Sequence, residues 1–175
     1  MTNFVTGEEL AELVLGFEHT AFRLEQRDDR YREAEEDEPF QRFLGGESVT
    51  ITGWNDEWEQ MLRARSSHGQ RMTRVRVVKE PHSAYTRFLL ALAAVNVPAG
   101  EDVRYLPYDR ARNLDLPHHD FWLIDSLRVA ILRFAEDSTL LGADVHDDPA
   151  LVVRHCYYRD VACHYATPFA GYVRS

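Results

Sequence analysis

Cysteine is almost absent from this 175-residue chain, and no long apolar run occurs in it. Cys156 and Cys163 are too few for a disulfide framework. On one helix they would lie about 10 Å apart along the axis, beyond the roughly 7 Å between Cα atoms that a disulfide spans. Two reduced thiols indicate a cytoplasmic protein. No apolar run approaches the ~20 residues that cross a bilayer, and the N-terminus lacks the apolar segment of a signal peptide, so we expect no membrane association.

Positive charge is scarce as well. Lys79 is the single lysine beside 19 arginines, a bias that codon usage in a GC-rich genome explains, and the formal net charge is −9. General nucleic-acid binding is disfavoured, because neutralising phosphates requires a surplus of lysine and arginine. An anionic lipid surface is disfavoured for the same reason. The charge suits small-molecule chemistry or a basic protein partner.

Strong catalytic and cofactor motifs are missing too. The chain has no G-x-x-x-x-G-K-[ST], G-x-G-x-x-G, H-E-x-x-H, G-x-S-x-G or C-x-x-C sequence. P-loop nucleotide hydrolysis, zincin proteolysis, α/β-hydrolase chemistry and zinc-finger binding therefore lose most of their support. We expect no cofactor.

What the chain does contain is enough apolar material for one core. Hydrophobic residues make up 45% of the sequence, and no repeat or Gly/Ser-rich linker divides it, so residues 1–175 are expected to form a single domain. Residues 28–38 are almost entirely charged (DDRYREAEEDE). Such a composition buries little apolar surface and predicts an acidic loop or a frayed helical segment.

Start signals and apolar spacing predict several helices. Thr6 and Glu9 have the spacing of a capping box before a helix. Asp148 and Pro149 are the best start signal, for a long C-terminal helix that reaches about Ala166. Further helices are expected to begin at Pro39, after Asn55 and after Ser83.

Strand patterns begin at Thr73. Arg74 and Arg76 alternate with valines, as in a half-buried strand. The predicted strands lie near residues 73–79, 103–106, 121–125, 128–135 and 139–146. The last three are joined by short polar links, which permit hairpins but not parallel crossovers. The sequence therefore predicts an α+β fold, a mainly antiparallel sheet packed with N-terminal helices and a long C-terminal helix.

Five segments spread over nearly the whole chain, in order, resemble one actinobacterial family, domain of unknown function 6879. They are FEHTAFRLE (17–25), RVRVVKEP with SAYTRF (74–88), AGEDVRYLP (99–107), LPHHDFWLID (116–125) and VVRHCYYRDVA (152–162). The resemblance implies a regulatory setting, because members are often encoded beside helix-turn-helix regulators. It implies no activity and no site residues.

The C-terminal helix holds the first candidate residues for chemistry. Asp160 and His164 are four residues apart, as are His155 and Arg159, so each pair shares a helix face. A carboxylate beside an imidazole can fix its tautomer and raise its basicity, which suits a general base or a metal ligand. The alternative is that these residues make structural ion pairs only.

The second candidate is His118-His119-Asp120, in a loop before a predicted strand. These residue types bind zinc or iron, but adjacent residues rarely point at one ion. A metal site would need His155 or His164 as well, and a merely polar loop is the simpler interpretation. We expect no metal.

Arg74 and Arg76 are the third candidate. Strand alternation places both guanidinium groups on one sheet face, where they could bind a carboxylate or a phosphate. They could equally pair with acids of a covering helix or with solvent.

Three functions remain open. The leading hypothesis is a non-enzymatic regulatory or interaction protein that contacts a partner such as a helix-turn-helix regulator. The alternative is a small enzyme or ligand-binding domain with a polar pocket joining the His118–Asp120 loop to the C-terminal helix, possible only if these side chains converge. An RNA-cleaving toxin is a further variant, disfavoured by the charge.

Overall fold

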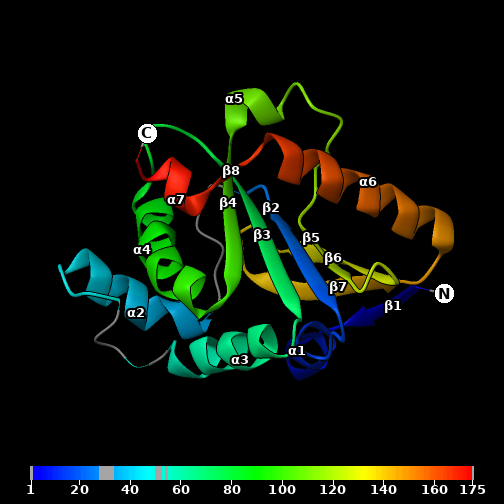
Figure 1. Ribbon diagram of the computed structural model, residues 1–175, viewed down its shortest axis with the longest axis horizontal. Helices are drawn as coiled ribbons and strands as arrows, with labels where there is room; N and C mark the ends of the chain where they lie inside the picture. Colours follow the sequence, from blue (N-terminus) through cyan, green and yellow to red (C-terminus); the bar gives the residue numbers. More distant parts are fainter. Residues whose placement is uncertain (1, 28–33, 50–52, 54, 175) are drawn as a thin grey trace.

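The computed structural model describes residues 2–27, 34–49, 53 and 55–174. Within them an eight-stranded sheet has the order β1-β7-β6-β5-β2-β3-β4-β8 (Figure 1). The strands are β1 (Thr2–Val5), β2 (Thr20–Glu25), β3 (Arg71–Val78), β4 (Glu101–Pro107), β5 (Phe121–Ile124), β6 (Arg128–Phe134), β7 (Leu140–His146) and β8 (Thr167–Pro168). The predicted α+β class is confirmed.

The sheet is mixed, with most strand pairs antiparallel. β2, β3 and β4 are parallel neighbours, whereas β5, β6, β7 and β1 continue the sheet in antiparallel order. The parallel pairs need long crossovers, and the chain makes them through α2 (Ala34–Leu44) with α3 (Asp56–Ser67), and then through α4 (Ala84–Ala99). The first crossover was not predicted, because β2 was not recognised as a strand.

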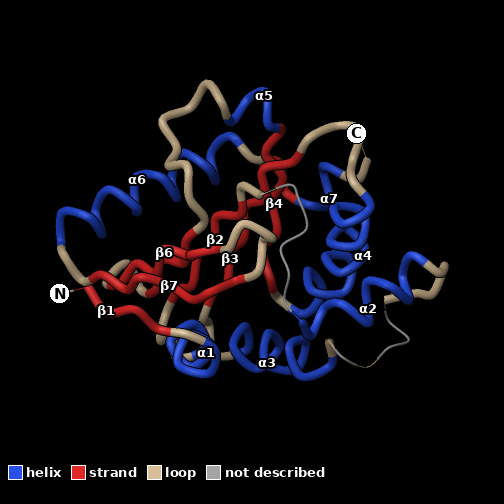
Figure 2. The backbone as a smooth tube through the Cα atoms, turned by 180° about the vertical axis from the view of Figure 1, so that it is seen from behind, coloured by secondary structure: helices blue, strands red, loops and turns tan. Residues whose placement is uncertain are grey.

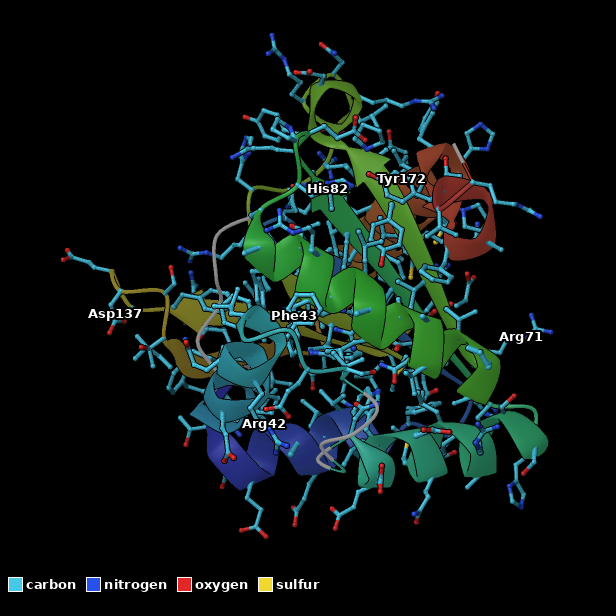
Figure 3. All side chains as sticks on the ribbon, turned by 90° about the vertical axis from the view of Figure 1, so that its left-hand side faces the viewer. Arg42, Phe43, Arg71, His82, Asp137 and Tyr172 are labelled. Carbon is cyan, nitrogen blue, oxygen red and sulfur yellow. The ribbon has the colours of Figure 1, made fainter. Side chains whose placement is uncertain are left out.

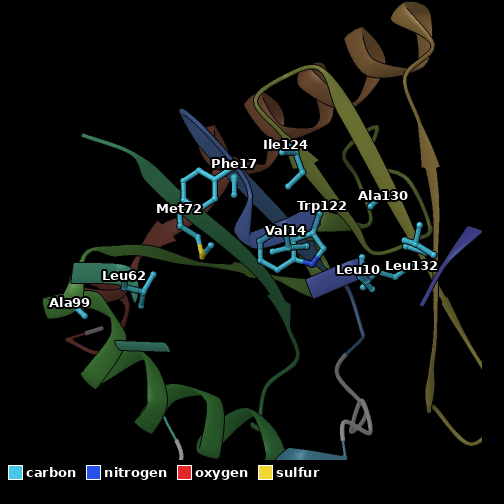
Figure 4. Close-up of a cluster of buried hydrophobic side chains, with 13 residues drawn as sticks. Leu10, Val14, Phe17, Leu62, Met72, Ala99, Trp122, Ile124, Ala130 and Leu132 are labelled. Atoms are coloured by element: carbon cyan, nitrogen blue, oxygen red, sulfur yellow. The ribbon is translucent and has the colours of Figure 1, made fainter. Parts of the chain in front are cut away.

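Helices cover both faces of the sheet. α1 (Gly7–Leu15), α3 and α4 lie on one face, and α6 (Pro149–Tyr165) lies across the other with α5 (Tyr108–Ala111) near its end (Figures 1 and 2). Figure 4 shows the core under α1 and α3, where Leu10, Val14 and Leu62 pack on strand residues such as Trp122 and Ile124. A second core lies under α6.

The end of the chain packs back onto β4. In α7 (Phe169–Tyr172), the Tyr172 ring stacks on the buried ring of Tyr105, with centroids 4.6 Å apart. The Tyr172 hydroxyl lies 3.0 Å from Nε2 of His82 and donates a hydrogen bond to Glu80 (Figure 3). None of the helices in the described part of the chain is long and apolar enough to cross a membrane.

Two helix starts differ from the sequence-based expectation. Thr6 is the N-cap of α1, but its side chain makes no capping hydrogen bond, so the predicted capping box does not form. α2 begins at Ala34 and not at Pro39, which lies inside it. Of the acidic segment 28–38, residues 34–38 thus belong to a helix, and residues 28–33 lie outside the described part of the chain. By contrast, Asp148 caps α6 as predicted, accepting from the Leu151 N–H.

Candidate functional site

The loop that carries His118, His119 and Asp120 is clamped to the end of β2. The Gln26 side-chain amide donates to the backbone carbonyls of Pro117 and His119. The Gln26 backbone N–H donates to Oδ1 of Asp120 at 2.9 Å. Three contacts from one residue fix both the position and the direction of the loop.

Asp120 serves this clamp rather than a solvent-facing site. It is 4% exposed, and its Oδ2 lies 3.3 Å from a terminal nitrogen of Arg23, which is also buried. Burial raises the pKa of Asp120, and the nearby Arg23 opposes that rise. The buried ion pair ties the loop to the central strand.

His119 and His155 meet across the gap between this loop and α6. Their Nε2 atoms are 3.1 Å apart. Nδ1 of His155 lies 2.8 Å from the Leu151 carbonyl oxygen, which can only accept, so Nδ1 carries the proton and Nε2 of His155 has a lone pair. In the neutral pair, His119 then donates its Nε2–H to His155. The rings of Phe121 and Tyr158 pack edge-on against His155.

Burial makes both imidazoles poor bases. It lowers the pKa of His119 to about 4, with help from the neighbouring His155 and from Arg133. It also lowers the pKa of His155, although the hydrogen bond to Leu151 opposes this. Both rings are therefore neutral at physiological pH. A general base works best with a pKa near the working pH, so this pair suits metal binding or structure better than proton transfer.

The remaining candidates on α6 do not join this pair. Asp160 accepts a hydrogen bond from Nε of its neighbour Arg159, which also donates to the Ser126 hydroxyl. The His164 ring packs edge-on against Tyr165. In the described part of the chain, no hydrogen bond or ion pair joins Asp160 to His164. His118 is exposed at the loop surface.

Arg74 and Arg76 share one sheet face, as predicted, but their partners come from neighbouring strands. Arg74 donates to Glu101 of β4 at 2.7 Å and pairs with Glu25 of β2, and Arg76 donates to Glu25 at 2.6 Å. Burial opposes the charge of Glu25, yet Arg74, Arg76 and Arg23 outweigh it and hold its pKa far below the usual range. The arginines thus neutralise acids of the sheet itself.

A small hollow lies at the end of these strands, beside the first turns of α4. Its cavity volume is about 10 Å³, room for about one water molecule, and its lining is Glu25, Arg27, Arg76, Val77, Val78, Tyr85, Thr86 and Leu89. Pockets for drug-sized ligands are commonly about 300–1,000 Å³, so this hollow is far too small to hold such a ligand. Among the residues that the structure describes, no group of three or more His, Cys, Asp or Glu side chains is placed to hold a metal ion.

Sequence reasoning missed the residues that hold the site together. Arg23 and Glu25 belong to the unrecognised strand β2, and Gln26 directly follows it, so no pattern assigned them a partner. Asp125 was missed as well: its carboxylate accepts the backbone N–H groups of Glu18, His19 and Thr20 at 2.7–2.8 Å. The sequence signal for these contacts was the aspartate at each end of β5, Asp120 and Asp125.

The described residues form an α+β fold with a mixed sheet between two helical layers, and this fold is similar to that of two solved structures. One is a phospholipase D family member, Nuc from Salmonella typhimurium, and the other is NucT from Helicobacter pylori. Each is 10% identical to this chain, with a TM-score of 0.54 over 96% of this chain and 97% of the other. At this identity the likeness shows the fold alone.

The chain belongs to the family described as domain of unknown function (DUF6879), whose model matches residues 8–174. This confirms the family resemblance of the sequence. No curated protein matches the chain.

Proposed function

We propose that this protein is a non-enzymatic interaction protein that regulates a partner by binding it, the partner being a basic, DNA-binding helix-turn-helix regulator. The single observation that carries the proposal is that the candidate catalytic and binding side chains at the centre of the molecule already pair with one another inside the fold. Asp120, Arg74 and Arg76 neutralise partners inside the fold. His119 and His155 are neutral and hydrogen-bonded to each other.

The charge of the chain supports the choice of partner. The net charge of −9 favours association with a basic protein and speeds the encounter. The exposed carboxylates of Glu8, Glu9 and Glu12 belong to α1, which lies with α3 at the same edge of the molecule (Figure 1). These three carboxylates can contact a positive surface, whereas the buried acids already pair with arginines inside the fold.

Size-exclusion chromatography of this protein mixed with the regulator tests the proposal. A complex is expected at low salt and its dissociation at high salt, because screening weakens surface charge pairs. Replacing Glu8, Glu9 and Glu12 by lysine should weaken the complex. The matched control reverses Asp109 and Asp115, which are exposed near the opposite end, and should leave it intact. Absence of a complex at low salt contradicts the proposal.

A second candidate is a phosphodiester-cleaving enzyme, acting on RNA or a related ester. Two observations favour it: the fold shared with a phospholipase D family member, and the contact between His119 and His155 that joins the loop to α6. The low pKa of His119 weighs against it. Hydrolysis of a chromogenic phosphodiester or of RNA, lost in His119→Gln and kept in His164→Gln, would replace the first proposal by this one.

A further inference from the structure

The facing imidazoles of His119 and His155 have the spacing of two ligands on one metal ion. Their Nε2 atoms are 3.1 Å apart while the ring centroids are 5.4 Å apart, so the nitrogens and not the ring faces point toward each other. Two imidazole nitrogens on a tetrahedral zinc ion, each bonded at about 2.0–2.1 Å, are separated by about 3.3 Å. An ion bonded to both nitrogens lies to one side of the line that joins them, so the rings must tilt toward it while the nitrogens move apart by about 0.2 Å.

His155 is held in the tautomer that a metal requires. Its Nδ1–H donates to the Leu151 carbonyl one helical turn earlier, at 2.8 Å. The proton on Nδ1 leaves the lone pair of Nε2 directed at His119. Metal-binding histidines commonly donate their second ring N–H to a backbone carbonyl in this way, which fixes the ring and raises the basicity of the ligand nitrogen.

His119 is held in place through its backbone. Gln26 donates to the His119 carbonyl at 3.1 Å and to that of Pro117. The next residue, Asp120, is locked by Arg23. Because the loop is fixed by contacts that do not involve the imidazole, the ring can move its proton from Nε2 to Nδ1 and bind an ion at Nε2 without loss of its support.

We propose that His119 and His155 together bind a borderline divalent cation, Zn²⁺ or Cu²⁺, each through Nε2. Imidazole nitrogen is a favoured ligand of both ions. His119 then carries its proton on Nδ1, and the ion takes the place of the hydrogen bond between the rings. The described residues supply only these two side chains as ligands, so water or an added anion fills the other positions. The site is accordingly weaker than a structural zinc site with four protein ligands.

Titration of the metal-free protein with CuCl₂, followed by calorimetry and electron paramagnetic resonance, tests the proposal. Cu²⁺ is the ion of choice because its complexes are the strongest of the divalent series. One equivalent is expected to bind, with hyperfine coupling from two nitrogens. His119→Gln and His155→Gln should each weaken that binding at least about tenfold, since even an outer partner of a ligand is worth about 10–100-fold.

His164→Gln is the matched control, because His164 lies on the same helix but packs against Tyr165 and not against the pair. It should bind Cu²⁺ as the wild type does. Equal affinity in His119→Gln, in His155→Gln and in the wild type would overturn the proposal, as would a two-nitrogen spectrum that persists unchanged in both variants. If His155→Gln fails to fold, His119→Gln in the surface loop and the wild-type spectrum still decide. The result does not depend on the partner proposed above.

Discussion

The Nε2 atoms of His119 and His155 lie 3.1 Å apart although 36 residues separate the two histidines in the chain. The contact exists because α6 crosses the sheet face on which the strand after His119 packs, with Phe121 wedged between the loop and the helix. Each ring has lost part of its water to this packing. The pair therefore links the protonation state of the loop to the docking of α6.

That linkage predicts a stability that falls with acid. An unfolded imidazole takes up a proton near pH 6.5, whereas burial lowers the pKa of folded His119 to about 4 and also lowers that of His155. Between these values the unfolded state binds more protons, so the free energy of unfolding decreases as the pH falls and is fully retained above pH 6.5. Each histidine contributes a slope of at most about 1.4 kcal/mol per pH unit.

Urea denaturation at several pH values, in the presence of a chelator, measures this slope. His119→Gln cannot take up a proton and should flatten the dependence between pH 6.5 and 4. His164→Gln should keep the wild-type slope. A wild-type slope in His119→Gln would show that the pair is not the source of the pH dependence.

Asp125 gives the second prediction. Its carboxylate accepts the backbone N–H groups of Glu18, His19 and Thr20, where the chain enters β2, and thereby anchors the start of this strand. Asp125→Ala replaces these hydrogen bonds by bonds to water and should cost about 1–2 kcal/mol of the free energy of unfolding. Asp125→Asn keeps one oxygen and tolerates the positive φ of 52°, so it should cost less.

Acid should remove the same contribution. Burial alone would raise the pKa of Asp125, but the three N–H groups hold it below its ordinary value of 3.8. The stabilisation is therefore complete above pH 3.8 and is lost as the pH falls through the lower folded value. Calorimetric melting at acidic pH should show the cost of Asp125→Asn shrinking toward zero. A cost independent of pH would contradict the role of the charge.

The sequence could predict the elements whose patterns are local. The α6 start at Asp148 and Pro149 is confirmed, as are the hairpin strands β5, β6 and β7. β2 was not recognised because its charged positions, Arg23 and Glu25, lie on a sheet face that the structure shields from water. A buried arginine in a central strand is tolerated only when an acid arrives from elsewhere, here Asp120 from 97 residues away.

The candidate site was predictable in its residues but not in its pairing. His119 and His155 were both candidates, yet the helical spacing indicated Arg159 as the neighbour of His155. Which of the histidines meets the loop depends on how α6 is rotated on the sheet, and that rotation is set by Val152 and Ala162 packing into the core. Periodicity alone gives the buried stripe of a helix and not its contacts.

The third prediction concerns the charges buried under α4. Glu25 pairs with both Arg74 and Arg76, and all three are largely shielded from water. Glu25→Gln removes the negative charge and leaves two guanidinium groups in a poorly solvated site. The expected loss is about 3–5 kcal/mol, typical of breaking a buried ion pair on one side. Chemical denaturation measures it.

A surface pair provides the control. Glu59 and Arg63 form an exposed ion pair on α3, so Glu59→Gln should cost no more than about 1 kcal/mol. The double variant Glu25→Leu with Arg76→Met should lose less stability than the sum of the losses in Glu25→Leu and Arg76→Met alone, because both charges disappear together. Additive losses would mean that the two side chains do not interact.

Gly142 in β7 provides the last prediction. It has a φ of +146°, and a Cβ at this position would meet the Val5 carbonyl oxygen and the Phe4 ring of β1. Gly142→Ala must therefore push β1 away from the sheet edge while also straining its own backbone. A loss of about 2–5 kcal/mol is expected from strain and overpacking together. Gly46→Ala has a positive φ but open space around it, so it should cost only the backbone strain of about 1–2 kcal/mol. Hydrogen exchange separates the two causes: in Gly142→Ala the amides of β1 and β7 should exchange faster than those of β2 and β3. Uniformly faster exchange would mean that β1 is not the element displaced.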